Sequence, residues 1–421
     1  MKKNFVTARL VLLAAVTTLL VQGCLKDTGT QHYVMYTPFY KTTAQVRAGI
    51  KNDVAQPIVT AGKMYVQGNY IFLVEKEKGI HIIDNSNPSS PVNKAFITIP
   101  GNEDIAVSGN ILYADCYTDL LAIDVSNVNN IVLKSFTANV FADRQYVNGY
   151  CVDSGKVIFE WQLRDTVIDI QLREGQGIWR NGNYITSTPI YALSLSASAN
   201  TTTGVGGSMA RMAIQNNHLY AVSTESLLSI SIANPTAPDF LSSKNLHLGI
   251  GSAETIYPFQ DKLFIGSMSG MYIFSTTDPN NPSLLSTFTH ATVCDPVITD
   301  GTNAFITLHS GTYCTGVDNE LDVVNVQDVV HPSFVKKYTL THPLGLGKDG
   351  NTLIVCDGDL KIYDATNVNA IQLKQSIAMS DPYDVICING LAIVSAKDGL
   401  YQFDYTNPSN VKQLSKLSIT Q

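Results

Sequence analysis

Charged residues are scarce in this chain. They make up 15% of its 421 residues, against 45% apolar residues, and the formal net charge is −7. The sequence has no block of Lys or Arg, which argues against a nucleic acid as the partner. The apolar fraction is too high for a disordered chain, so we expect a large folded core.

Long helical patterns are also missing, because no extended stretch with a period of 3.6 residues follows residue 60. Two of the aromatic residues are Trp and 20 are Tyr, while Val, Ile, Thr, Ser, Asn and Gly are abundant. These residue types favour strands and turns. We therefore expect an all-β protein.

Common catalytic and metal-binding motifs are absent from the sequence. It has no Gly-x-Ser-x-Gly, no His-Glu-x-x-His, no phosphate-binding loop and no dinucleotide fingerprint. Its Cys and His residues lack the spacing of metal ligands. We expect neither a cofactor nor a metal ion. Two carboxylates that meet only in space would escape this search, so an enzyme that acts on carbohydrate stays an alternative.

The apolar run at the N-terminus, residues 10–20, is too short to span a bilayer. It follows Lys2, Lys3 and Arg9 and leads to Val21-Gln-Gly-Cys24, which resembles a bacterial lipobox. We predict a lipoprotein signal peptide over residues 1–23 and lipidation of Cys24. The protein would then be extracytoplasmic and anchored to the outer membrane, on its surface or its periplasmic side. An ordinary secretory signal, with Cys24 as a structural thiol, is the alternative.

Cysteine use fits an exported protein, because six of the seven cysteines remain after Cys24 and an even number permits disulfides. Cys294 and Cys314 flank one predicted hairpin. They are the pair that we expect to form a disulfide.

The dominant feature of the chain is one repeated stretch. In residues 79–91, the alternating Ile80 and Ile82 indicate a strand, Asp84 starts a turn, and two prolines prevent the strand from continuing. Related stretches begin at Gly79, Asp119, Pro189, Ser226, Gly270, Glu320, Asp359 and Gly399. Five of the seven spacings lie between 37 and 44 residues, a period that indicates stacked structural units.

A hairpin precedes each copy, as in residues 105–114, where Gly109-Asn110 joins two apolar strands. One unit is therefore a meander of four strands, which is typical of a β-propeller blade. Eight units fill residues 57–421, and seven blades with an insert in the third copy are the alternative. Residues 24–56 lack the repeat, and we expect a tether there, with 47–54 as a short helix or a loop.

The core of the repeat, as in Leu121-Ala-Ile-Asp124, resembles the LVIVD repeat of bacterial and archaeal cell-surface proteins. The whole of 57–421 is similar to the LVIVD-repeat lipoproteins of Bacteroidota. This resemblance implies a β-propeller at the cell surface. It brings no catalytic residues, because that family has no established activity to carry over.

Aromatic residues in two inserts are the first candidates for a site. The insert at about 161–188 in the third copy contains Trp161 and Trp179, and a shorter insert in the sixth copy contains Tyr313. Both inserts belong to the propeller face that bears the connections from strand two to strand three and from strand four to the next blade. Such aromatic residues either anchor a partner or pack the inserts onto their blades.

Polar residues that recur just before the innermost strands are the second candidates, and the propeller fold places them around the mouth of the central channel. They either bind a small ligand or satisfy backbone donors of neighbouring blades. They are Asp104, Arg211, Glu254, Asp295, His342 and Asp384.

These features together predict a lipid-anchored module that binds an envelope protein or glycan without catalysis. The face with the two inserts is the expected binding face, because the opposite face carries near-uniform Gly and Asp/Pro turns. The alternative enzyme would use carboxylates at the channel mouth as acid and base.

Replacing Cys24 with Ser should release the protein from the membrane into the soluble fraction, because the lipid attachment is lost. Cell fractionation followed by immunoblotting measures this. Unchanged membrane association of the Cys24→Ser variant would contradict the lipoprotein prediction.

Overall fold

The computed structural model describes residues 32–147, 150–168, 172, 176–186, 205–248, 252–289, 296–309 and 319–419. Within the chain there are two compact units. The larger unit comprises residues 40–159 and 192–421, and the smaller unit comprises residues 1–39 and 160–191. In the described part of the chain, no helix has the length and apolar character that crossing a membrane requires.

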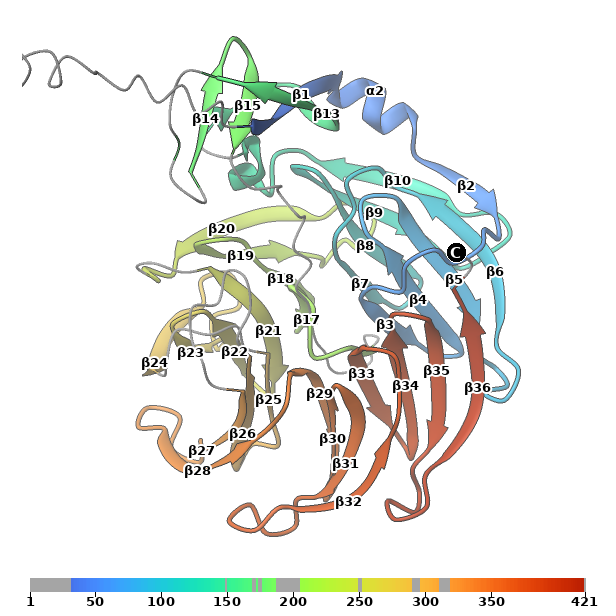
Figure 1. Cartoon of the computed structure of the whole chain (residues 1–421), viewed down its shortest axis with the longest axis vertical. Coiled ribbons are helices and arrows are strands. Elements are labelled where there is room, and N and C mark those ends of the chain that lie inside the picture. The colour runs from blue at the N-terminus through green and yellow to red at the C-terminus, as the bar shows by residue number, and fades with distance from the viewer. Residues whose placement is uncertain are drawn as a thin grey trace, which may run out of the picture. The chain divides into compact units, whose positions relative to one another are not determined.

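The larger unit is a β-propeller. Its blades are antiparallel sheets in which strands neighbour one another in chain order. Figure 1 shows them in a ring with each first strand toward the centre. The first three blades contain β3 (Met64–Gln67), β4 (Tyr70–Glu75), β5 (Gly79–Asp84) and β6 (Val92–Thr98); β7 (Ile105–Ser108), β8 (Ile111–Cys116), β9 (Asp119–Asp124) and β10 (Val132–Thr137); and β17 (Met212–Gln215), β18 (His218–Val222), β19 (Ser226–Ser231) and β20 (Asp239–Asn245).

The remaining blades repeat the same order of strands. They contain β21 (Ala253–Phe259), β22 (Lys262–Ser267), β23 (Gly270–Ser275) and β24 (Ser283–Thr289); β25 (Val297–Thr299), β26 (Asn303–Leu308), β27 (Glu320–Asn325) and β28 (Ser333–Thr339); β29 (Pro343–Asp349), β30 (Thr352–Asp357), β31 (Asp359–Asp364) and β32 (Gln372–Ile377); and β33 (Pro382–Ile388), β34 (Leu391–Ala396), β35 (Gly399–Asp404) and β36 (Lys412–Ser418).

The described residues thus form seven blades, whereas the sequence led us to favour eight. The difference lies in the third repeat copy, which does not form a blade. Its residues between 156 and 186 instead form strands of a separate sheet, and its weak repeat stretch at 189–194 lies outside the described residues. The insert leaves the propeller between β10 and β17, which is a connection from a fourth strand to the next first strand.

Turn chemistry explains why the blades repeat so regularly. The Asp84 carboxylate accepts a hydrogen bond from the backbone N–H of Ser86 at 3.0 Å, and Asp404 does the same with Thr406 at 2.9 Å. These bonds start the turn that leads to the fourth strand, as the sequence predicted. Gly68 has a φ of 56° in the first hairpin, a left-handed conformation that glycine adopts without strain.

The N-terminal part of the chain is folded from residue 32 onward, although we expected a tether there. β2 (Lys51–Val54) pairs with the outer strand β6, and β16 (Val205–Gly206) pairs with the inner strand β3. The first blade therefore has six strands. Between β1 (His32–Thr42) and β2 lies the helix α2 (Thr43–Ala48), which Thr42 caps through the backbone N–H of Gln45.

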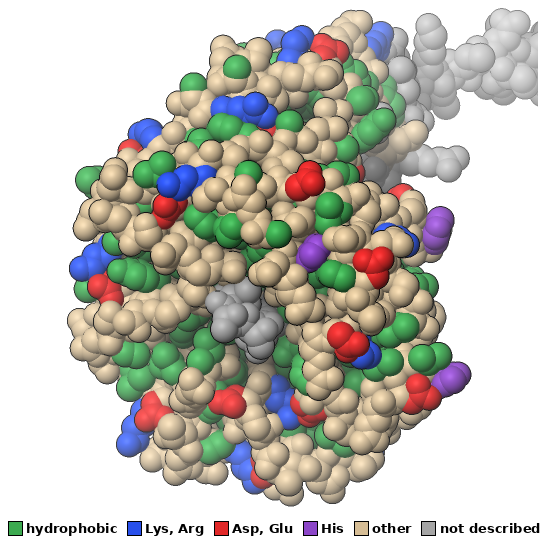
Figure 2. All heavy atoms as spheres, turned by 180° about the vertical axis from the view of Figure 1, so that it is seen from behind, with side chains coloured by type: hydrophobic (Ala, Val, Ile, Leu, Met, Phe, Trp, Pro, Cys, Tyr) green, Lys and Arg blue, Asp and Glu red, His purple; other side chains and the backbone are tan. Residues whose placement is uncertain are grey.

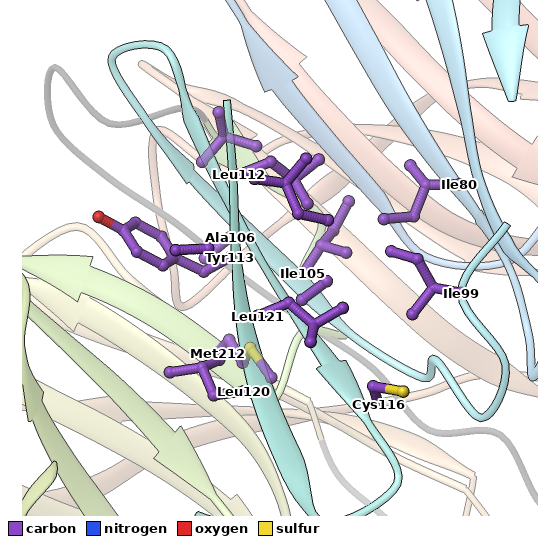
Figure 3. Packing of buried hydrophobic residues seen from close by; sticks show 14 of the residues in the cluster. Ile80, Ile99, Ile105, Ala106, Leu112, Tyr113, Cys116, Leu120, Leu121 and Met212 are labelled. Carbon is purple, nitrogen blue, oxygen red and sulfur yellow. The ribbon is translucent and has the colours of Figure 1, made fainter. Parts of the chain in front are cut away.

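Apolar side chains fill the spaces between neighbouring blades. Figure 3 shows Ile80 and Ile99 of the first blade pointing toward the second, while Met212 of the third blade lies on the other side of that sheet. The ring closes in the same way, because Ile83 of the first blade and Ile393 of the last belong to one buried cluster. No strand is shared across this closing seam in the described residues.

Residues that the sequence suggested as equivalent positions of the third strands are all buried: Ile82, Ile123, Ile273, Val323, Ile362 and Phe403. Phe403 and Ile123 are nevertheless out of register with the other four residues. Ile362 packs against the following blade, whereas Phe403, one position further along its strand, packs against the preceding blade. Ile123 is offset in the same way. A blade is buried on both faces, so burial alone does not reveal a shift of one residue.

The smaller unit is built on a four-stranded sheet. The strand order is β13 (Lys156–Val167), β1, β15 (Asn183–Thr186) and β14 (Gly177–Arg180). Tyr33, Leu172 and Ile185 are its buried core. Before this insert, the chain of the larger unit forms the 3₁₀ helix η1 (Ala142–Gln145) and the hairpin of β11 (Tyr146–Val147) and β12 (Tyr150–Cys151).

Replacing Ile82 with Ala should lower the free energy of unfolding by about 2–4 kcal/mol, because it removes buried methyl groups and leaves a cavity between two blades. Leu284→Ala is the matched control, because Leu284 is 52% exposed on an outer strand. Urea unfolding followed by Tyr fluorescence measures both. Equal destabilisation by the two substitutions would contradict the packing described above.

Candidate functional site

One position at the start of each inner strand is set by the hairpin that follows it. In each blade, the inner strand pairs with the second strand up to a last residue at the hairpin turn. The residue four positions before that last residue is equivalent in all blades. In blade order, these residues are Lys63, Asp104, Arg211, Thr255, Pro296, Gly345 and Asp384. The ionisable members lie on four consecutive blades, from the seventh through the third, and acidic and basic residues alternate among them.

Of the predicted residues, three occupy this position: Asp104, Arg211 and Asp384. Glu254 lies one residue earlier and is buried in β21. Asp295 lies outside the described residues. Lys63 was missed, although it precedes the Gly68 turn by five residues, just as Asp104 precedes the Gly109 turn.

Asp104 is at the centre of the charged positions and is almost fully buried. The Lys63 ammonium nitrogen lies 2.6 Å from one Asp104 carboxylate oxygen, and the backbone N–H of Arg211 donates to the same oxygen. The second oxygen accepts from the backbone N–H of Ile105 at 2.7 Å. Burial raises the pKa of Asp104 and lowers that of Lys63, and their contact opposes both shifts. These bonds join the first three blades.

Arg211 also links two blades, because its guanidinium donates to the backbone carbonyl of Ala253 at 3.1 Å. Arg144 instead fixes η1 to the second blade, because it contacts Asp115 at 2.6 Å and lies 4.0 Å from Glu103. Burial alone would raise the pKa of Glu103, but Arg144 and other nearby cations lower it to about 2. Glu103 is therefore ionised at neutral pH and does not act as an acid there.

His342 takes no part in the contacts around Asp104. Its backbone N–H donates to the Asp357 carboxylate at 2.6 Å, and its ring lies 5.7 Å from that of the buried His309. Asp357 also accepts from the backbone N–H of Thr341 at 2.8 Å. Here a carboxylate satisfies the backbone donors of a connection between blades, which is the structural alternative weighed from the sequence.

Asp384 is fully buried beneath the segment 205–210. The Ser208 hydroxyl lies 3.3 Å from one Asp384 oxygen, and the same hydroxyl accepts from the backbone N–H of Leu346 at 2.6 Å. Gly207 must be glycine, because a Cβ at this position would overlap the Asp384 carboxyl group. Within the described residues, the second Asp384 oxygen has no hydrogen-bond partner. Burial raises the pKa of Asp384 to about 8, so it is protonated at neutral pH.

The segment 205–210 crosses several inner strands. It begins as β16 beside β3 of the first blade, and the backbone N–H of Gly207 donates to the Met64 carbonyl at 3.2 Å. After Ser208 it reaches the fourth blade, where Ile256 donates to the Ala210 carbonyl at 3.1 Å. The carboxyl group of Asp384 is therefore closed off from solvent by the chain itself.

The tryptophans of the insert lie together in the smaller unit. The ring centroids of Trp161 and Trp179 are 6.1 Å apart, Trp161 meets Tyr36 edge-on at 6.1 Å, and Trp179 lies 5.6 Å from Tyr184. Trp179, Tyr184 and Tyr36 are successive partners in the register of β14, β15 and β1. Tyr36 was missed because we expected a tether there, although the continuous apolar run of residues 33–36 is consistent with a buried strand.

Several predicted residues lie outside the described part of the chain: Cys24, Cys294, Tyr313 and Cys314. The predicted disulfide between Cys294 and Cys314 therefore stays a prediction. The described cysteines, Cys116, Cys151, Cys356 and Cys387, are free thiols.

Asp384→Asn should change how stability depends on pH. Between about pH 4, where a free Asp titrates, and about pH 8, the native state holds a proton on Asp384 that the unfolded chain releases. The free energy of unfolding should therefore fall as pH rises through this window, and the neutral Asn should remove that part of the slope. Urea unfolding at pH 5, 6.5 and 8 measures the slope. The control is Asp381→Asn, at an exposed carboxylate paired with Lys397; equal slopes for both variants would refute the assignment.

Comparison with known proteins relates the chain to a repeat family and to solved structures of similar fold. The LVIVD repeat family matches residues 60–97 and 102–137, which cover β3 to β6 of the first blade up to Ile97 and all four strands of the second blade. A search of curated proteins found no match. The fold is similar to that of a Lactobacillus plantarum protein, with a TM-score of 0.53 at 12% identity over 92% of this chain and 98% of that one. It is also similar to a periplasmic gluconolactonase of Pseudomonas aeruginosa, with a TM-score of 0.51 at 9% identity over 92% and 97%. The chain thus carries LVIVD repeats within a β-propeller fold.

Proposed function

We propose that the protein is a lipid-anchored β-propeller of the cell envelope that binds an envelope protein or glycan. The anchor would be Cys24, attached to the outer membrane on its surface or its periplasmic side. The smaller unit would supply the binding surface. The observation that carries this proposal is the group of aromatic side chains on the sheet of that unit.

The two faces of this sheet differ in composition. Ile185 belongs to the buried core, and the side chain of its neighbour Tyr184 points to the opposite face. Ile178 and Trp179 are related in the same way. One face is therefore the core, and the other carries Tyr36, Trp161, Trp179 and Tyr184.

Trp161 and Trp179 are half-buried, so each ring packs on its neighbours and still presents part of its surface. Side chains of this kind supply much of the free energy of binding at interfaces, because they bury a large area and retain a polar atom. Exposed Arg164 and Arg180 follow them in sequence and provide charged groups at the edge of the sheet. A polar rim around aromatic anchors is the usual composition of a binding surface.

The contacts around the inner strands favour binding over catalysis. An acid or base on a polymer substrate must reach the bond that it cleaves. Asp104 is 1% exposed and bonded to Lys63 and to backbone N–H groups, and Asp384 is fully buried under Ser208. These carboxyl groups hold blades and the central segment in place. On the face seen in Figure 2, acidic and basic side chains of the described residues are interspersed.

Replacing both Trp161 and Trp179 with Ala should abolish capture of a partner from solubilised cell envelope by the immobilised mature protein. The reason is the loss of the two largest rings of the aromatic face. Immunoblotting for captured protein and lectin staining for captured glycan separate the two classes of partner.

Phe240→Ala with Phe334→Ala is the matched control, because it removes two exposed aromatic rings from outer strands of the propeller. A double Trp→Phe variant, which keeps aromatic packing, should retain much of the capture. Full capture by the double Ala variant would contradict the proposed binding surface. Turnover of an envelope glycan by the protein would instead support the enzyme alternative.

A further inference from the structure

A cavity of about 470 Å³ opens beside the first blade, at the place where the N-terminal segment crosses it. One side is the turn between β4 and β5, with Glu75, Glu77 and Lys78. The other sides are the outer strand β6 and residues 53–59 of the crossing segment. The volume lies in the range of small-molecule sites. Among the described blades, this one alone carries an added outer strand, so the cavity is not part of the repeat.

A hydrogen-bond network fixes the crossing segment to the blade. The side-chain amide nitrogen of Asn93 donates to the Gln56 carbonyl at 2.8 Å and lies 3.2 Å from Nδ1 of His81. Nδ1 therefore accepts, and Nε2 of His81 carries the hydrogen that it donates to Glu75 at 3.1 Å. The backbone N–H of Val59 donates to the same Glu75 oxygen at 3.2 Å.

Glu75 is ionised in this network. Burial alone would raise its pKa, but hydrogen bonds from Lys78, His81 and the Val59 backbone lower it overall. His81 is fully buried against the ring of Phe96, with ring centroids 4.7 Å apart, and burial lowers its pKa. The rigid wall of the cavity thus contains a carboxylate at neutral pH beside a neutral imidazole.

The charges that line the cavity do not balance. Three carboxylates line it, those of Asp53, Glu75 and Glu77, against the single cation Lys78. Lys78 is already bonded to Glu75 at 2.5 Å, and Lys51, from outside the cavity, pairs with Asp53 at 2.9 Å. Glu77 has no ion-pair partner within the described residues. Glu77 lines the cavity and is also exposed to solvent, which puts this residue at the mouth of the cavity.

The uncharged lining contains the polar Gln56 and Thr98, and its apolar residues come from both sides of the cavity. Phe96 of β6 forms one wall, and Pro57 and Val59 of the crossing segment form another. Val59 is 48% exposed, although its backbone is hydrogen-bonded to Glu75. An apolar slot with an unpaired carboxylate at its mouth is complementary to a cation at the end of a hydrocarbon chain.

We propose that this cavity binds an ammonium or guanidinium group carried on an apolar stem, with the Glu77 carboxylate as its ion partner and Phe96 and Val59 against the stem. The group is either the side chain of a Lys or Arg on a partner protein or the end of a free amine. This site is independent of the aromatic face of the smaller unit.

Titration of the full-length protein in detergent micelles with 1,5-diaminopentane tests the charge preference. Isothermal calorimetry at low ionic strength should show binding that 1-pentanol and pentanoate do not reproduce. Glu77→Gln should weaken this binding at least fivefold. The matched control is Glu225→Gln, an exposed carboxylate in the corresponding turn of the third blade, which has no added outer strand.

Val59→Trp tests whether the cavity itself is the site, because the larger ring would fill it without changing any charge. This variant should lose binding, while circular dichroism and the melting temperature confirm that it is folded. Retained binding in Val59→Trp together with loss in Glu77→Gln would place the amine on the open surface and overturn the proposal.

Comparing two probes identifies the source of the cation. Tighter binding of Nα-acetyl-lysine methylamide than of 1,5-diaminopentane supports a protein side chain, and the reverse order supports a free amine. Absence of binding for both probes, or equal binding by the wild-type protein and Glu77→Gln, refutes the cavity as an amine site.

Discussion

Every blade of this protein depends on its neighbours, because each sheet has two apolar faces and only another blade can cover them. In the first blade, Ile82 packs toward the second blade and Ile83 toward the last one, and both are buried. An isolated blade would expose both rows to water, at a cost of roughly 25 cal/mol for each Å² of apolar surface. The stable solution is a closed ring, in which stability is distributed over the interfaces between blades.

The sequence predicted those parts of the fold that depend on local features, and it did not predict those that depend on distant partners. Strand pattern, the Asp84 type of turn and a period near 40 residues are local features, and they predicted the four-stranded meander and the propeller. The number of blades is not a local feature. The stretch at Pro189 resembles a repeat, but the preceding residues pair with β1, some 150 residues earlier in the chain. A strand that finds a distant partner gives no signal in its own residues.

The candidate site was predictable to a similar extent. A fixed distance from a turn located Asp104, Arg211 and Asp384, and applied to Gly68 the same rule locates Lys63. This rule does not predict that the carboxyl groups of Asp104 and Asp384 are buried. The ammonium of Lys63 and the hydroxyl of Ser208 satisfy these carboxyl groups from outside their own blades. Glu75 and His81 were missed as neighbours of a cavity, because its other wall comes from a segment without any repeat pattern.

The segment 205–210 has a consequence for the seam between the last and first blades. In the described residues, the first and last blades meet through apolar side chains and hydrogen bonds, and they share no strand. The segment touches β3 on one side of this seam and Asp384 on the other. It therefore acts as an internal clasp. Opening the ring at this seam would require the segment 205–210, from the middle of the chain, to dissociate as well, so the two ends do not have to be interwoven for the ring to stay closed.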